Sequence, residues 1–172
     1  ANLADFGAAI GSDENLRDVF RAEITESVRT LRAAFDAGVP LATGSESGFS
    51  LTPYGDWHYR ELQVFVEDLG MTPLQAINSA TEQGARALKL EGELGCIKPD
   101  YLADILIFDG EPEAHITQLG DPDRFRHIMK DGRLVDTSTP LPKEWQLPGW
   151  RVSEYSERIL TKELVQSMGL NP

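Results

Sequence analysis

The chain has 172 residues, of which 41% are hydrophobic, and this is enough for one domain with its own core. Its formal net charge of -12 argues against nucleic-acid and anionic-membrane partners, because phosphate groups are bound by basic surfaces. The single cysteine, Cys96, cannot form a disulfide within the chain, and no window reaches the apolar length of a membrane span. The N-terminus does not read as a signal peptide and lacks an initiator Met. We therefore expect a cytoplasmic protein that is a piece of a longer one.

The first predicted element is a helix over residues 13–37. Ser12 or Asp13 can cap its start, and Gly38 ends it. Its apolar residues recur at three- and four-residue steps and form one stripe, which consists of Val19, Phe20, Ile24, Val28, Leu31 and Phe35. The short apolar run "VPLAT", residues 39–43, then predicts a parallel strand that is buried on both faces.

Two helices are expected next. The first runs from about Tyr59 to Asp68 and stops at Gly70. The second covers "TPLQAINSATEQGARALKL", and Thr72 followed by Pro73 is a strong signal for its start. The residues expected to face inward from this helix are Ile77, Ala80, Ala87 and Leu88.

The period of the apolar residues changes after this helix. "ADILIFDG" predicts a buried strand, and "RHIMKDGRLVD" predicts a hairpin around Asp131-Gly132. The Pro-rich stretch "TSTPLPKEWQLPGW" leads to a last helix over residues 153–168, with the apolar residues Tyr155, Ile159, Leu160, Leu164 and Met168. Helices around a buried strand, followed by β hairpins, indicate the α/β class with a small β element at the end.

The motif with chemical content is "GSESG", which follows the predicted strand. A nucleophile elbow would need Ser at the centre and a helix directly after it, but the centre is Glu46, and Pro53 and Gly55 follow soon after. The other interpretation is an acid at the C-terminal end of a barrel strand, where α/β barrels carry their functional residues. A carboxylate there can bind a metal or take a proton from a metal-bound water.

Three stretches, in this order and spacing, resemble the C-terminal part of the amidohydrolase superfamily: "AGVPLATGSESGF", "TPLQAINSATEQGARALKL" and "GELGCIKPDYLADILIFDG". The similarity covers roughly residues 30–136 and is greatest to imidazolonepropionase-like and prolidase-like hydrolases. It implies an α/β fold made of the C-terminal segments of a (β/α)8 TIM-type barrel plus the return strands of a small β-sandwich. The implied domains are the barrel part over 1–92, the sandwich strands over 93–136, and a Pro-rich linker with a C-terminal helix over 137–172.

The resemblance makes Glu46 the catalytic acid and a metal ligand, because relatives carry there an Asp that binds the metal and shuttles a proton. Glu is one methylene longer, which moves the carboxylate by about a bond length. The family's His-x-His motif and later ligands are absent, and the three histidines, His58, His115 and His127, are not at ligand spacing. Because a catalytic zinc site needs about three protein ligands, we expect the full-length parent to hold a divalent metal, with zinc as the expected ion, and this chain alone to bind none.

Substrate-binding residues are predicted around Glu46. His58, in a loop that runs into a helix, either contacts substrate or supports the site, with a partly exposed loop histidine as the alternative. Tyr54 and Trp57 either line a substrate pocket or cover the barrel rim.

The roles expected for the other polar residues differ with their distance from the site, and the resemblance places His115 and His127 in the sandwich region, far from Glu46. Ser45 and Ser47 either hydrogen-bond the site carboxylate or satisfy turn amides. Structural roles are expected for the helix-start charge pair Arg60 and Glu61, for Asp104, and for His115 and His127.

We expect the parent protein to hydrolyse the C–N bond of a small-molecule amide, cyclic amide or dipeptide through a metal-activated water. The alternative is a non-catalytic α/β remnant that acts as an assembly or binding module, which the missing ligands favour for this chain alone. A barrel without most of its strands leaves an unpaired edge and uncovered apolar faces. We therefore expect either a homo-oligomer or association with the missing N-terminal half of the barrel.

Overall fold

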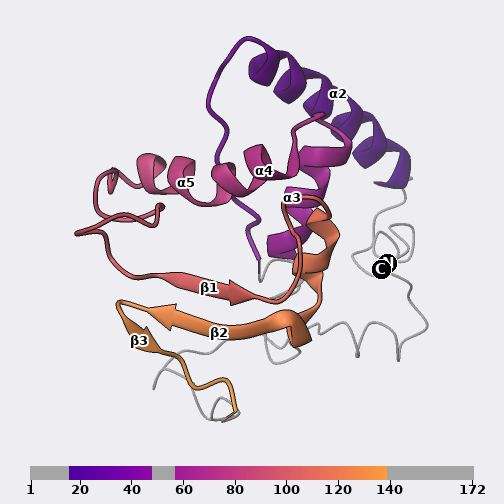
Figure 1. The fold of residues 1–172 in the computed structure, drawn as a ribbon. Helices are drawn as coiled ribbons and strands as arrows, with labels where there is room; N and C mark the ends of the chain where they lie inside the picture. Colours follow the sequence, from indigo (N-terminus) through magenta and orange to yellow (C-terminus); the bar gives the residue numbers. More distant parts are fainter. Residues whose placement is uncertain (1–15, 48–56, 139–172) are drawn as a thin grey trace, which may run out of the picture.

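The computed structural model describes residues 16–47 and 57–138, in which helices lie above a small antiparallel sheet (Figure 1). The helices are α2 (Leu16–Asp36), α3 (Trp57–Glu67), α4 (Pro73–Ala80) and α5 (Glu82–Ala87). The strands are β1 (Ile105–Phe108), β2 (Phe125–Lys130) and β3 (Arg133–Leu134), and the 3-10 turns η1 (Ile116–Gly120) and η2 (Pro122–Arg124) connect β1 to β2. Within these residues, none of the helices combines the length and apolar character needed to cross a bilayer.

The core forms around α3, which packs against both α4 and η1. Its buried side chains come from α3, the turn after it, α4 and η1, and they are Leu62, Phe65, Leu69, Met71, Ala76 and Ile116. Partly buried apolar residues from α2 and the segment after it, including Val28, Phe35 and Leu41, pack against this cluster. Because each large apolar side chain that is fully buried contributes roughly 1.5–3 kcal/mol, this cluster is the main source of stability in the described residues.

Helix α2 confirms the predicted helix but buries little of its stripe. Val28 and Phe35 are partly buried, whereas Ile24 is 59% exposed and Leu31 is also exposed. The side chains of Val19 and Phe20 lie outside the described residues. The stripe therefore leaves apolar surface uncovered on this helix.

The predicted parallel strand at residues 39–43 is wrong for this structure. The segment is extended but belongs to no strand, and Val39 is 49% exposed. It is held instead by single hydrogen bonds, of which Thr43 N to Ser79 O in α4 is 3.3 Å long. A strand needs a neighbouring strand to share its backbone hydrogen bonds, and the described residues place none beside this segment. The barrel is accordingly not formed here.

The start of α4 confirms the sequence signal. Thr72 is the N-cap and Pro73 the first helical residue, and Gln75 completes a capping box. The backbone N–H of Gln75 donates to the Thr72 hydroxyl at 3.3 Å, and the Thr72 N–H donates to Gln75 Oε1 at 2.8 Å. The cap therefore satisfies backbone donors at the beginning of the helix.

The helix expected to continue through residue 90 instead breaks at Thr81, whose φ of -119° and ψ of -87° are not helical. The Thr81 hydroxyl donates to the Ile77 carbonyl at 2.8 Å. The break changes the direction of the following turn, which accounts for the wrong inward face beyond it but not for Ala80, which precedes it. Ile77 is partly buried, but Ala80 and Ala87 are exposed and Leu88 is 70% exposed.

The sheet has the order β1-β2-β3 and is antiparallel throughout. The hairpin between β2 and β3 is confirmed: Asp131 and Gly132 both have positive φ, 51° and 74°, as a two-residue type I′ turn requires. The predicted β1 strand is also present, but its burial is not, because Leu106 is 58% exposed and Ile107 is exposed on the other face. Neither face of β1 is fully covered by the described residues.

Some predictions lie outside the described residues. These are Tyr54, the Pro-rich stretch from residue 139 on, and the helix over 153–168.

Candidate functional site

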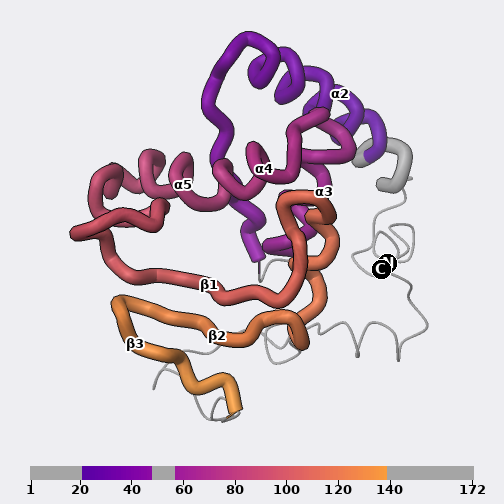
Figure 2. The backbone as a smooth tube through the Cα atoms, in the orientation of Figure 1, coloured from indigo at the N-terminus to yellow at the C-terminus, as the bar shows by residue number. Residues whose placement is uncertain are grey.

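Residues 43–47, which belong to the loop after α2, run past α4 toward the first turn of α3 (Figure 2). The Gly44 N–H donates a hydrogen bond to Glu61 Oε1 at 2.8 Å. The Ser45 hydroxyl lies 3.3 Å from His58 Nδ1 and 2.9 Å from the Ser47 hydroxyl. The loop is therefore attached to α3 through two side chains of that helix.

Glu46 lies in this loop and is exposed. Its φ of 48° falls in the left-handed region, which a long non-glycine side chain seldom adopts. The expected positioning element was a barrel strand, but the loop is positioned by hydrogen bonds to α3 and α4. The structure thus brings the Glu46 loop next to His58, while the catalytic role of Glu46 stays a prediction.

His58 and Trp57 are not in a loop, as the sequence predicted, but are the second and first residues of α3. His58 is exposed, and its Nδ1 contacts the Ser45 hydroxyl. Trp57 is partly buried. Their substrate-binding roles, and the site-supporting role considered for His58, stay predictions.

Glu61 is the residue that sequence reasoning missed. It was assigned to an ordinary charge pair with Arg60, but its carboxylate accepts the Gly44 N–H across the chain. Partial burial raises the pKa of Glu61, whereas the Gly44 N–H and the nearby His58 act in the opposite direction. One signal was available: His58 and Glu61 are three residues apart, so on a helix they share one face.

The described residues do not by themselves fit the divalent metal that the resemblance implies. In the ranges 16–47 and 57–138, no group of three or more His, Cys, Asp or Glu side chains is arranged to hold a metal ion. Next to the loop, His58 Nδ1 contacts the Ser45 hydroxyl and Glu61 Oε1 accepts the Gly44 N–H, so both side chains hold the loop. His115 and His127 are exposed, at the start of η1 and in β2, and neither belongs to a metal-binding group within the described residues. Glu46 as a metal ligand stays a prediction.

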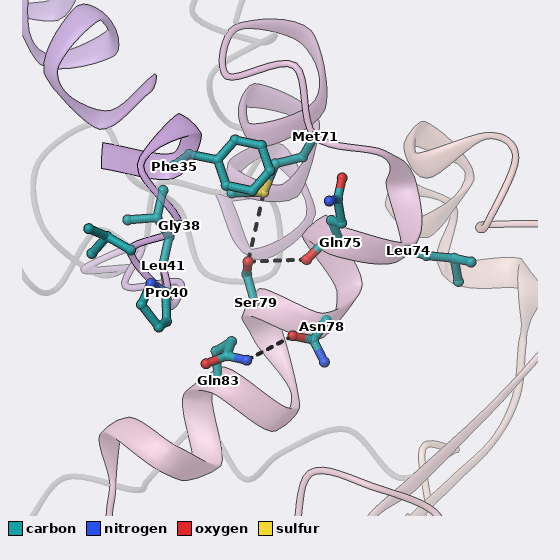
Figure 3. Close-up of a pocket in the computed structure, with 11 residues that line it drawn as sticks. Phe35, Gly38, Pro40, Leu41, Met71, Leu74, Gln75, Asn78, Ser79 and Gln83 are labelled. Carbon is teal, nitrogen blue, oxygen red and sulfur yellow. Dashed lines mark hydrogen bonds between the residues drawn. The ribbon is translucent and has the colours of Figure 1, made fainter. Parts of the chain in front are cut away.

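A cavity of about 390 Å³ lies at the opposite end of the extended segment, between α2 and α4 (Figure 3). Its lining is mostly apolar, with Phe35, Val39, Leu41, Met71 and Leu74 among the residues. Polar groups on α4 and α5 bond mainly to one another, as when Gln83 Nε2 donates to Asn78 Oδ1 at 3.0 Å. Neither Glu46 nor His58 lines this cavity, so it is separate from the predicted site.

Comparison with known families decides the affiliation of the chain. The sequence profile of the amidohydrolase family matches residues 12–135. The chain belongs to the amidohydrolase family. This confirms the resemblance inferred from the three sequence stretches and places the Glu46 loop, α3, α4 and the β1–β2 sheet within the matched region.

Amidohydrolases of several kinds are similar to the chain. Ochratoxinase from Aspergillus niger is 32% identical over 108 residues, which is 62% of this chain and 22% of that protein. Imidazolonepropionase from Rhodococcus jostii is 36% identical over 104 residues, 60% of this chain and 25% of that protein. A prolidase crystallised with N-methylphosphonate-L-proline superposes with a TM-score of 0.64 at 27% identity, covering 77% of this chain and 32% of that one.

These amidohydrolases are much longer than the region they share with this chain. The chain spans about a quarter of the length of the two curated relatives. It is a mixed α/β unit that matches part of the amidohydrolase fold, without a closed barrel in the described residues.

Proposed function

We propose that this chain forms the C-terminal quarter of a metal-dependent amidohydrolase that hydrolyses the C–N bond of an amide, cyclic amide or dipeptide. The family match over residues 12–135 supports the reaction class. The similarity to an imidazolonepropionase and to a prolidase with a proline phosphonate ligand supports small cyclic amides and proline dipeptides as substrates. The division into a barrel part up to residue 92 and sandwich strands over 93–136 belongs to the same proposal.

The observation that carries the proposal is the way the loop with Glu46 is held. Glu46 is exposed, on a loop attached to α3 by the Gly44–Glu61 and Ser45–His58 contacts. A metal or substrate site needs side chains that are held in place by their surroundings. We assign Glu46 as one carboxylate of such a site, whose other ligands come from parts of the protein beyond the described residues.

A non-catalytic assembly or binding module is the second candidate. It is favoured by the lack of a complete donor set within the described residues and by exposed apolar side chains such as Ile24 and Leu74. This function needs only the surface of the chain and not the chemistry of Glu46.

The coding sequence upstream of Ala1 separates the two candidates. A His-x-His motif about one barrel length before residue 1 supports the enzyme, and a start codon near Ala1 supports the module. If the longer protein exists, its hydrolysis of proline dipeptides and cyclic amides should fall by about 10²- to 10⁴-fold in Glu46→Gln. Glu67→Gln, an exposed position on α3, is the matched control and should leave kcat/KM unchanged. Equal activity of Glu46→Gln and wild type would remove Glu46 from the site.

The metal content of the 172-residue chain is a direct measurement. After dialysis against a zinc-free buffer, elemental analysis should find far less than one zinc per chain, because one carboxylate does not hold a metal without converging partners. About one zinc per chain would show that further ligands converge on Glu46, either within one chain or between two.

A further inference from the structure

Two side chains on one face of α3 reach the same loop. His58 and Glu61 are three residues apart and so project from the same side of the helix. His58 contacts the hydroxyl of Ser45, and Glu61 accepts the backbone N–H of Gly44 at 2.8 Å. Between them they hold the two residues that directly precede Glu46.

We propose that Glu61 is a positioning residue, which fixes the backbone of the loop so that Glu46 is presented in its left-handed conformation. This rests on the proposed function only in so far as Glu46 is the site acid. The attachment of the loop by Glu61 is a separate statement about the chain, and it can be tested without activity or metal.

The partial burial of Glu61 argues that the contact is more than a surface charge near a helix start. Moving a carboxylate out of water costs free energy unless hydrogen bonds compensate. The Gly44 N–H supplies such a bond, and bonds from N–H groups to ionised carboxylates are stronger than those between neutral groups. An acid that served only as a helix-start charge would stay solvated and would need no partner 17 residues away.

The left-handed backbone of Glu46 explains what the Gly44–Glu61 hydrogen bond does. A non-glycine residue with a φ of 48° persists only when its surroundings determine the backbone. The bond from Gly44 to Glu61 fixes the peptide group two residues before Glu46, and the Ser45–His58 contact fixes the next residue. Removing the Glu61 acceptor therefore frees the loop to leave the left-handed conformation at Glu46.

The test uses NMR on the ¹⁵N,¹³C-labelled 172-residue chain and three variants. Glu61→Ala removes the acceptor, Glu61→Gln keeps an acceptor oxygen of the same reach, and Glu67→Ala is the control on the same helix. Glu67 accepts a hydrogen bond from Gln63 within α3 and forms none with the described loop residues 43–47.

In Glu61→Ala we expect the Gly44 amide to exchange with solvent at least about tenfold faster than in wild type, relative to core amides such as that of Leu69. The strong intraresidue HN–Hα cross-peak that marks a positive φ at Glu46 should weaken. Both signals should be close to wild type in Glu67→Ala, and in Glu61→Gln they should change less than in Glu61→Ala, because the neutral amide oxygen still accepts the bond but more weakly. Unchanged Gly44 exchange in Glu61→Ala, or the same change in Glu67→Ala, would overturn the proposal.

Wild type alone provides a second measurement that does not depend on any variant folding. The Gly44 amide proton should shift with pH along the same curve as the Glu61 side-chain carboxyl carbon. Separate curves would overturn the proposal. Coupled curves in a longer protein that hydrolyses no amide would leave Glu61 as the loop's positioning residue and reject only the proposed function.

Discussion

The carboxylate of Asp104 holds the tip of the β2–β3 hairpin through Asp131, since Asp104 Oδ1 accepts the Asp131 N–H at 2.8 Å although 27 residues separate the two. The other carboxylate oxygen accepts from Lys130 Nζ at 2.6 Å, and the Gly132 N–H donates to the Ala103 carbonyl at 3.0 Å. The entry to β1 and the hairpin turn are thus joined at one point, which confirms the structural role predicted for Asp104.

Replacing Asp104 by Ala should lower the thermal unfolding midpoint of the chain, because the Asp131 N–H loses its acceptor. Asp104→Asn keeps an acceptor oxygen and should lose less. Glu113→Ala, an exposed position before η1, is the control and should leave the midpoint within error. A midpoint for Asp104→Ala equal to that of the control would show that the tie contributes nothing to stability.

The same carboxylate gives a pH dependence with a defined sign. Hydrogen bonds from Lys130 and from the Asp131 N–H hold the pKa of Asp104 below its ordinary value of 3.8. A carboxyl whose pKa is lower in the folded state stabilises the fold above its unfolded pKa and ceases to do so as the pH falls through the folded pKa. The unfolding midpoints of wild type and Asp104→Asn should therefore differ at neutral pH. They should converge as the pH falls through the pKa that Asp104 has in the folded state. A difference that grows on acidification would contradict this assignment.

The capping box at α4 should contribute measurably to stability. Thr72→Ala removes the hydroxyl that accepts the Gln75 N–H and should reduce the free energy of unfolding by about 1 kcal/mol, as measured by urea titration. Thr72→Ser keeps the oxygen and should restore most of the loss. If both variants lose the same amount, the methyl group and not the cap is responsible.

The exposed apolar face of α2 predicts self-association of the isolated chain. Ile24 is 59% exposed and Leu31 is exposed two turns further along, on the stripe that the core leaves uncovered. Light scattering at micromolar concentration should detect species larger than a monomer, and Ile24→Lys should shift them toward the monomer. Thr25→Lys, at an exposed position beside it, should not. A clean monomer with cooperative unfolding in wild type would mean that the described elements close their core without a partner.

The sequence predicted those elements whose signals lie between neighbouring residues. Thr72 and Pro73 begin α4, and Asp131-Gly132 turns the hairpin, because the backbone conformation there depends on the residues themselves. The run at residues 39–43 failed because a strand depends on partners that are distant in the sequence.

The site, too, was predicted where the signal is local and missed where it depends on residues distant in the sequence. The motif located the Glu46 loop, but it did not indicate how that loop is held. The Gly44–Glu61 bond joins positions 17 residues apart, and no local pattern records such a pairing. The inward face predicted beyond Thr81 failed for a related reason, because a single non-helical residue changes which side chains face the core.

The left-handed backbone at Glu46 has a consequence for engineering this loop. Aspartate enters the left-handed region more readily than longer side chains do, and φ at Glu46 is 48°. Glu46→Asp is therefore expected to relax the backbone and at the same time to restore the shorter carboxylate that the family resemblance implies. Gains at an active site usually come with a loss of stability, but here the two properties should improve together. A selection for heat resistance and a selection for hydrolysis would then converge on the same replacement.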